Sequence, residues 1–214
     1  MVYYTIPATE TMEPFEGCFR KLLPSLVHSI DPSARRRHTV VTDVPWITEF
    51  VKSTRMKVVD GTEVSDFKSA IEAHIANFNE NKDDDFVLLP IEYPQRTNRH
   101  VMAVLSGYRR SSAKSMLCRT QSPASASKLL TESPNSPWFE NLGGESWQDQ
   151  TPQAFEHSHM VSVVERSELP ELNHWLWNPN TDFFDVGIDA NPTTSQDPIS
   201  KLPYGTDSEH EFDI

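Results

Sequence analysis

The sequence predicts an α/β or α+β fold, in which a small mixed sheet packed by helices precedes a partly disordered acidic C-terminal region. Helix-like and strand-like apolar patterns alternate along the first half of the 214 residues. The later part is acidic and proline-containing, with few periodic segments. We therefore expect five regions: an N-terminal segment (1–10), an α/β core domain (11–110), a basic Ser/Pro-rich arm (111–137), an acidic aromatic segment (138–186) and a disordered tail (187–214).

The first predicted helix covers residues 11–30. Its apolar residues recur at spacings of four, three and four, which places them on one helical face: Phe15, Phe19, Leu22 and Leu26. Pro24 lacks an amide hydrogen and clashes with the preceding turn. We expect it to split the segment into two short helices or to kink it near Leu23.

Two short strands and a helix follow. The β-branched run His38–Asp43 predicts a strand, and Pro45 suits the first turn of a helix that reaches about Lys52. Met56–Val59 predicts a second strand, which the turn at Asp60 and Gly61 closes.

The clearest predicted helix covers residues 64–79. Its apolar positions are spaced by three or four residues, namely Val64, Phe67, Ile71, Ile75 and Phe78. The nearly continuous apolar run 86–93 predicts a strand covered on both faces, with Pro90 at an edge or a bulge. Residues 101–108 predict another strand, antiparallel to it because the connection is short.

Charge is segregated along the chain. Residues 132–214 carry sixteen acidic side chains against two basic ones, whereas residues 93–131 carry seven basic side chains and no Asp or Glu. The net charge of −12 opposes binding to nucleic acid, and no stacking platform or helix-turn-helix motif is present. We expect the basic arm and the acidic segment to attract one another or charged protein partners.

The acidic segment also contains bulky aromatic residues. Acidic and apolar residues alternate around Trp175, Trp177, Phe183 and Phe184, a pattern typical of linear motifs that bind a groove on a partner. The alternative is docking of this segment onto the protein's own core. We therefore predict a non-enzymatic regulatory or adaptor protein that binds another protein here.

Thiol chemistry is the second hypothesis. A histidine beside a cysteine can deprotonate the thiol, so His100 with Cys118 or Cys18 would support a hydrolase or a transferase. No acidic residue between 93 and 131 is available to orient the imidazole. Cys18 also fits a core position of the first helix.

Metal binding is the third hypothesis. On a strand, His157 and His159 would face the same side and could chelate a divalent transition metal. A third ligand is not fixed by the sequence, so polar residues at an exposed strand end are the alternative.

Other motifs are few. Two arginines precede Ser111 and Ser112, as in sites of basophilic kinases, and a phosphate there would reverse the local charge. No glycine-rich phosphate loop, nucleophile elbow or Cys-x-x-Cys motif occurs, so we expect no cofactor. With no long apolar run and no secretory signal pattern, we expect a cytoplasmic or nuclear protein that does not contact membranes.

Overall fold

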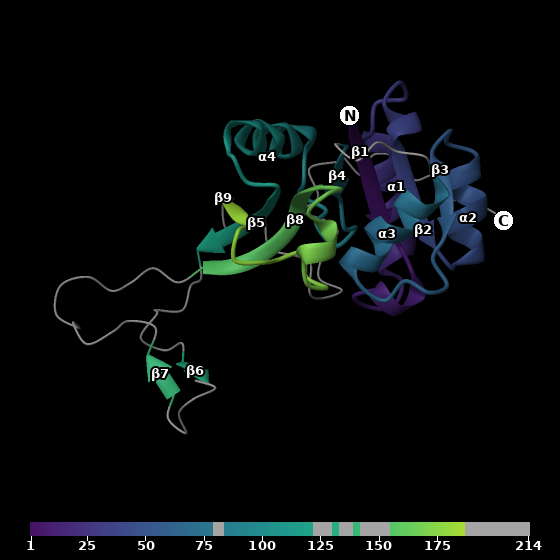
Figure 1. The fold of residues 1–214 in the computed structure, drawn as a ribbon. Coiled ribbons are helices and arrows are strands. Elements are labelled where there is room, and N and C mark those ends of the chain that lie inside the picture. Colours follow the sequence, from purple (N-terminus) through teal and green to yellow (C-terminus); the bar gives the residue numbers. More distant parts are fainter. Residues whose placement is uncertain (79–83, 122–129, 133–138, 142–154, 187–214) are drawn as a thin grey trace.

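A seven-stranded mixed sheet is the centre of the fold in the computed structural model, which describes residues 1–78, 84–121, 130–132, 139–141 and 155–186 (Figure 1). The strand order is β3-β2-β1-β4-β8-β5-β9. These strands are β1 (Val2–Pro7), β2 (His38–Thr42), β3 (Lys57–Asp60), β4 (Asp85–Leu88), β5 (Ser115–Gln121), β8 (Phe155–Glu165) and β9 (Asp182–Asp185). A separate two-stranded sheet consists of β6 (Leu130–Glu132) and β7 (Phe139–Asn141).

Parallel pairing dominates the first half of the sheet. β1 pairs in parallel with both β2 and β4, and β2 pairs in parallel with β3. β8 runs antiparallel to β4 and β5, while β9 is parallel to β5. The chain passes from β1 to β2 and β3 on one side and then returns to add β4 on the other side. The boundary between β1 and β4 is therefore a topological switch point, and the expected mixed α/β sheet is confirmed.

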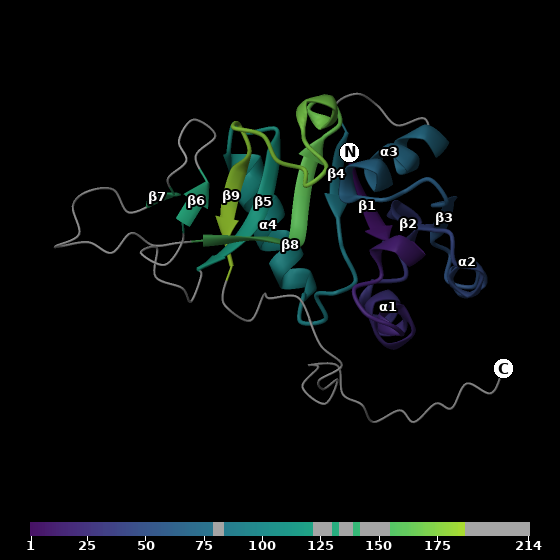
Figure 2. The same cartoon turned by 90° about the horizontal axis from the view of Figure 1, so that it is seen from below.

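Helices cover both faces of the sheet. They are α1 (Cys18–Ser29), α2 (Pro45–Lys52), α3 (Phe67–Asn77) and α4 (Asn98–Arg110), and short 3-10 helices lie at η1 (Glu10–Met12), η2 (Arg35–Arg37) and η4 (Leu169–Glu171). Figure 2 shows α1 and α3 on opposite sides of β1. Buried residues of α1, α2 and α4 share one apolar cluster with Ile6 and Val87, whereas Ile71 of α3 packs with Phe86 and with Leu172 and Leu176.

Two predicted helices are confirmed with their caps. Pro45 occupies the first turn of α2, where its missing amide hydrogen leaves no intrahelical bond unmade. α3 begins after Asp66, whose carboxylate accepts a hydrogen bond from the Ser69 amide at 2.8 Å. The predicted strands at Met56–Val59 and His38–Asp43 are also present, as β3 and β2.

The first predicted helix differs from expectation at Pro24. α1 continues through Pro24 instead of splitting near Leu23. Buried side chains stand on both sides of the proline, with Leu22 and Leu23 before it and Val27 after it. Burial of this face stabilises the helix by more than the one hydrogen bond that proline removes.

The predicted strand at residues 101–108 is wrong, because these residues lie in α4. The buried residues of α4 are Val101, Val104, Leu105 and Tyr108, which recur at the helical spacings of three and four. The continuous apolar run Val101–Leu105 hides this period in the sequence.

The sheet takes strands from outside the predicted core of residues 11–110. β1 comes from the N-terminal segment and is a central strand, β5 comes from the predicted arm, and β8 and β9 come from the acidic aromatic segment. β4 ends at Leu88, although buried residues continue to Tyr93. The predicted disordered tail, Gly187–Ile214, lies outside the described residues, as does much of the arm.

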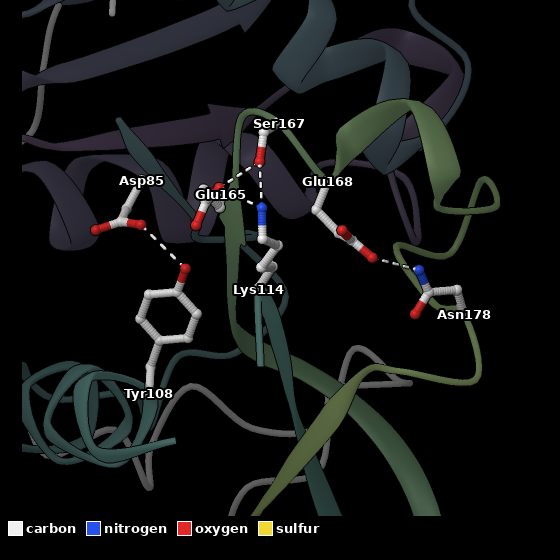
Figure 3. A network of polar contacts seen from close by, with 7 residues as sticks. All are labelled: Asp85, Tyr108, Lys114, Glu165, Ser167, Glu168 and Asn178. Atoms are coloured by element: carbon white, nitrogen blue, oxygen red, sulfur yellow. Dashed lines mark hydrogen bonds and ion pairs between the residues drawn. The ribbon is translucent and has the colours of Figure 1, made fainter. Parts of the chain in front are cut away.

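A polar network joins α4 to the sheet (Figure 3). The hydroxyl of Tyr108 donates to Asp85 Oδ1 at 3.0 Å, and burial raises the pKa of that carboxyl. At the start of β5, Lys114 Nζ lies 3.0 Å from both Glu165 Oε1 and the Ser167 hydroxyl. These contacts fix where the C-terminus of α4, β4 and β8 meet. No helix within the described ranges is long and apolar enough to cross a membrane.

Candidate functional site

A crevice of about 400 Å³ opens at the carboxyl ends of β1 and β2. Open α/β sheets bind ligands in crevices at the carboxyl ends of their strands, near the topological switch point. This volume also lies in the range of ligand pockets. The crevice is lined by the loop between β1 and α1, the loop between β2 and α2, and the first turns of both helices, from which come Glu10, Glu13, Glu16, Gly17, Phe19, Arg20, Asp43, Val44, Pro45 and Trp46.

Two helix N-termini face this crevice. α1 begins after Gly17, whose φ of 76° is in the left-handed region that glycine adopts without strain. α2 begins at Pro45. The amides of a first helical turn lack intrahelical acceptors and carry a partial positive charge, so they favour anions. In α1 two of these amides are already used, because Cys18 N donates to Phe15 O at 3.0 Å and Phe19 N donates to Glu13 Oε1 at 3.1 Å.

The side chains of the crevice are mainly acidic. Carboxylates come from Glu10, Glu13, Glu16 and Asp43, and Arg20 is the one basic side chain among the lining residues. Asp43 Oδ1 accepts a hydrogen bond from Glu10 N at 2.8 Å, which holds the two loops together. Helix N-termini therefore offer sites for anions, while the carboxylates offer oxygen ligands for a cation.

An aromatic wall completes the crevice. Trp46 is partly exposed at the start of α2, and the guanidinium of Arg20 lies 5.0 Å from the centroid of its ring system. Such an arrangement is a cation–π contact. A planar ligand that displaces Arg20 can stack on the indole.

Glu92 lies just beyond the carboxyl end of β4, on the other side of the switch point. Burial raises the pKa of its carboxyl, and Arg96 opposes that rise. Glu92 and Glu13 both raise the pKa of the Cys18 thiol, so the two carboxyl groups lie near the start of α1. A half-buried carboxyl with a raised pKa just beyond a strand's carboxyl end is a candidate for proton transfer.

The predicted catalytic cysteines lie in environments that disfavour the thiolate form that a nucleophile needs. Cys18 and Cys118 are fully buried, and burial raises the pKa of each thiol to about 12. The Cys118 thiol donates to Val161 O at 3.2 Å. His100 is exposed at the start of α4, where its Nδ1 accepts from Thr97 N at 3.2 Å. No contact joins His100 to either thiol among the described residues.

The predicted metal ligands lie on one face of β8 but have aromatic neighbours. His157 stacks on Phe183 with ring centroids 5.1 Å apart, and His159 stacks on Trp175 at 5.9 Å. Burial lowers the pKa of His159 to about 4. Within the described ranges no group of three or more His, Cys, Asp or Glu side chains could hold a metal ion.

The predicted partner-binding aromatics divide into two groups. Trp175 and Trp177 remain 53% and 38% exposed. Phe183 and Phe184 belong to the edge strand β9 and pack against the two main apolar clusters. Docking onto the protein's own sheet, the alternative considered above, is thus what Phe183 and Phe184 do.

The predicted phosphorylation sites lie just after α4. The Ser111 hydroxyl donates to Asp182 Oδ2 at 2.7 Å, and Ser112 is exposed. Modification of either serine stays a prediction.

The crevice residues were not singled out from the sequence. Their signal is weak, because the loop after β1 has neither a glycine-rich phosphate motif nor clustered bases. Recognising residues 2–7 as a central strand would have placed Thr9–Glu16 at a carboxyl end, where sites gather.

Comparisons with known proteins give a consistent fold. A CMP:2-keto-3-deoxy-manno-octonic acid synthetase solved with CTP superposes with a TM-score of 0.61 and 12% identity, over 91% of this chain and 93% of that one. The 4-diphosphocytidyl-2C-methyl-D-erythritol synthase of Anaerococcus prevotii gives 0.59 and 11%, over 92% and 93%. The Francisella tularensis 2-C-methyl-D-erythritol 4-phosphate cytidylyltransferase gives 0.60 and 10%, over 92% and 95%. No family model and no curated protein sequence matches the chain.

These findings correct the functional prediction. The chain has the fold of cytidylyltransferases over nine-tenths of its length, so a non-enzymatic adaptor built on a small core with a free acidic motif is wrong. The thiol-enzyme and metal-binding alternatives were part of the same functional prediction and are wrong as well. The physical reason is that the acidic aromatic segment supplies β8 and β9 to the seven-stranded sheet.

Proposed function

We propose that the protein is a nucleotidyltransferase that binds a nucleoside triphosphate in the crevice and transfers the nucleotidyl group to a hydroxylated acceptor. One observation carries the proposal: a ligand-sized crevice lies at the carboxyl ends of β1 and β2, in a fold shared with cytidylyltransferases over nine-tenths of the chain. By analogy with those proteins, cytidine triphosphate is the nucleotide to test first.

Each part of a nucleotide has a matching part of the crevice. The base stacks on Trp46, and base–aromatic stacking contributes about 1–3 kcal/mol. The phosphates lie at the N-termini of α1 and α2, with Arg20 as the side-chain cation.

The acidic residues require a counter-cation for the triphosphate. A free triphosphate would be repelled by Glu10, Glu16 and Asp43. Mg²⁺ prefers oxygen ligands and is usually held by one or two carboxylates together with substrate phosphates, so two of these carboxylates would suffice to hold it. Held by these carboxylates, Mg²⁺ would neutralise part of the charge on the triphosphate. Binding of the nucleotide should therefore depend on Mg²⁺.

The transfer itself is a displacement at phosphorus. An acceptor oxygen forms a bond to the α-phosphorus, the bond from that phosphorus to the bridging oxygen breaks, and pyrophosphate leaves. The acceptor's proton must go to a base. We assign that role to Glu92, because it stands at the carboxyl end of β4 with a raised pKa.

The test begins with binding. Calorimetric titration of the protein with CTP in the presence of Mg²⁺ should give saturable binding, and removal of Mg²⁺ should abolish most of it. Trp46→Leu should weaken CTP binding about 5-fold to 100-fold through lost stacking. Trp175→Leu is the matched control, since Trp175 is an exposed tryptophan outside the crevice.

Catalysis is tested separately. Release of pyrophosphate from CTP should be measured with sugar acids and sugar-alcohol phosphates as acceptors, for the protein and for Glu92→Gln. Glu92→Gln should bind CTP normally and lose turnover. Absence of CTP binding at millimolar nucleotide, or equal effects of the two tryptophan changes, would exclude the proposal.

A further inference from the structure

A second pocket, of about 170 Å³, lies between α1 and α4 on the opposite end of α1 from the crevice. It takes Leu26 and Ser29 from the end of α1 and Asn98 and Val101 from the start of α4. It shares no lining residue with the crevice. A helix of 12 residues is about 18 Å long, so the two sites are separated by most of the length of α1.

Two stacked rings form one wall of this pocket. The rings of Tyr4 and His38 are nearly parallel, with centroids 4.3 Å apart and planes at 7°. His38 is 6% exposed, and its Nδ1 lies 3.0 Å from Ala34 O, to which it must donate. Nε2 is then a lone-pair acceptor, and no residue in the described part of the chain donates to it. A buried acceptor without a donor lowers stability, so a ligand hydroxyl there would satisfy it.

One arginine places positive charge in the wall of the pocket. Arg96 lines it at 5% exposure, and its Nη1 donates to Pro90 O at 2.7 Å and Met160 O at 2.9 Å, which fixes the guanidinium. The guanidinium groups of Arg37 and Arg109 lie near enough to lower the pKa of Tyr4, although burial raises that pKa overall.

Two further electrostatic features act in opposite directions. The N-terminus of the 13-residue helix α4 enters the wall at Thr97 and Asn98 and favours an anion. Asp31 is the one acidic lining residue and opposes an anion, because hydrogen bonds from the Ser33 hydroxyl and amide lower the pKa of its carboxyl and keep it ionised. Asp31 is exposed and its charge is screened by water, whereas Arg96 is buried, so the pocket suits an anion.

We propose that this pocket binds a small polyol phosphate, with a ligand hydroxyl donating to His38 Nε2 and the phosphate facing Arg96 and the N-terminus of α4. A dry 150 Å³ cavity holds a benzene-sized ligand, so 170 Å³ suits a three-carbon polyol phosphate better than a nucleotide. The site lies too far along α1 to hold the acceptor of the proposed transfer reaction, and its occupancy does not rest on that reaction.

The test is calorimetric titration of the full chain, without nucleotide, with glycerol 3-phosphate, glycerol and inorganic phosphate. Glycerol 3-phosphate should bind at least about tenfold more tightly than either fragment, since both groups are recognised. His38→Phe keeps the ring stacked on Tyr4 but removes Nε2, and should weaken binding about 3-fold to 10-fold.

A matched pair tests the charge. Arg37→Ala should weaken glycerol 3-phosphate binding about 2-fold to 5-fold, because the charge is exposed and partly screened. The neighbouring Arg36→Ala should leave the affinity unchanged, since Arg36 does not line the pocket and does not act on the pKa of Tyr4. Equal losses in both variants would mean a general charge effect and would overturn the assignment.

Three further results would overturn it: no binding of glycerol 3-phosphate, equal affinity for inorganic phosphate, or unchanged affinity in His38→Phe. If His38→Phe does not fold, the proposal is tested on the wild-type protein by NMR. Proton NMR of the saturated complex should show contacts between the ligand's carbon-bound protons and the Tyr4 ring, and their absence would refute the proposal. If the protein binds the polyol phosphate but does not bind CTP, the assignment of this pocket holds and only the proposed transferase activity is excluded.

Discussion

Three buried histidines make the stability of this protein depend on pH. Burial lowers the pKa of His38, His74 and His159 to about 4, against an ordinary value of 6.5. Between pH 6.5 and 4 the unfolded chain binds more protons than the folded chain. The free energy of unfolding thus has its full value above pH 6.5. It falls as the pH drops towards 4, by up to about 1.4 kcal/mol per pH unit for each histidine.

His74 allows this prediction to be isolated. Both ring nitrogens have partners, with Nδ1 2.8 Å from the Thr5 hydroxyl and Nε2 3.1 Å from the Thr39 hydroxyl. Urea unfolding of the wild type and of His74→Gln should be compared at pH 7 and pH 5. The variant should be less stable at pH 7 and lose about 1–2 kcal/mol less on acidification. Parallel pH profiles for the two proteins would contradict the assignment.

The same residue shows the limit of sequence reasoning at this scale. The apolar stripe of residues 64–79 predicted the helix correctly, with Ile71 at its centre. It did not predict that His74, rather than Ile75, is fully buried. Two threonines from neighbouring strands satisfy the imidazole, and a sequence does not reveal such partners before the strands are paired.

At the scale of elements, the packing of α4 against β9 includes one close contact at a glycine. A Cβ added at Gly107 of α4 would lie 2.8 Å from Phe184 Cδ2 on β9. Alanine is favoured over glycine in a helix by about 1 kcal/mol, but this clash should cost about 1–3 kcal/mol. Gly107→Ala should therefore destabilise the protein in urea unfolding.

A second substitution should reverse the sign of this change in the free energy of unfolding. In a Phe184→Leu background the smaller side chain leaves room, so Gly107→Ala should stabilise by up to about 1 kcal/mol through helix propensity. Ser106→Ala, at the neighbouring exposed position, is the control and should be nearly neutral in both backgrounds. A destabilisation of equal size in both backgrounds would show that Phe184 does not determine the effect.

Local patterns predicted some elements and missed others for a common reason. α2 and α3 carry their own signals, a proline at the first turn and a capping aspartate. β5 and β8 carry polar and charged residues at positions that become buried only after the two strands pair. Ser115, Thr120 and Ser158 are examples. Ser115 and Thr120 lie in the segment that was predicted to be a linker arm, and Ser158 lies in the predicted acidic aromatic segment. Tertiary pairing here overrides local preference.

At the scale of the whole molecule, the order of strands explains why charge composition misled the functional prediction. The basic stretch and the acidic stretch supply adjacent strands, and Arg119 of β5 pairs with Asp185 of β9 at 2.5 Å. Lys114, just before β5, forms a second pair with Glu165 at the end of β8. The segregated charges that suggested partner binding thus meet inside one sheet, where opposite charges on neighbouring strands favour pairing.

The last prediction follows from this sheet and concerns the smallest part of the chain that folds. Residues 11–110 lack β1, β5, β8 and β9, which leaves β2 and β4 without the strand between them. Ile6, Leu117 and Val163 would be missing from the two main apolar clusters. A domain with a total stability of about 5–15 kcal/mol does not survive the loss of a central strand.

The fragment 11–110 should therefore show no cooperative thermal unfolding, whereas the fragment 1–186, which retains every strand of the sheet, should unfold in a single transition. Circular dichroism and amide NMR spectra of the two fragments provide the comparison, and dispersed amide signals from 11–110 would mean that the sheet is divisible and that β1 is not its organising strand.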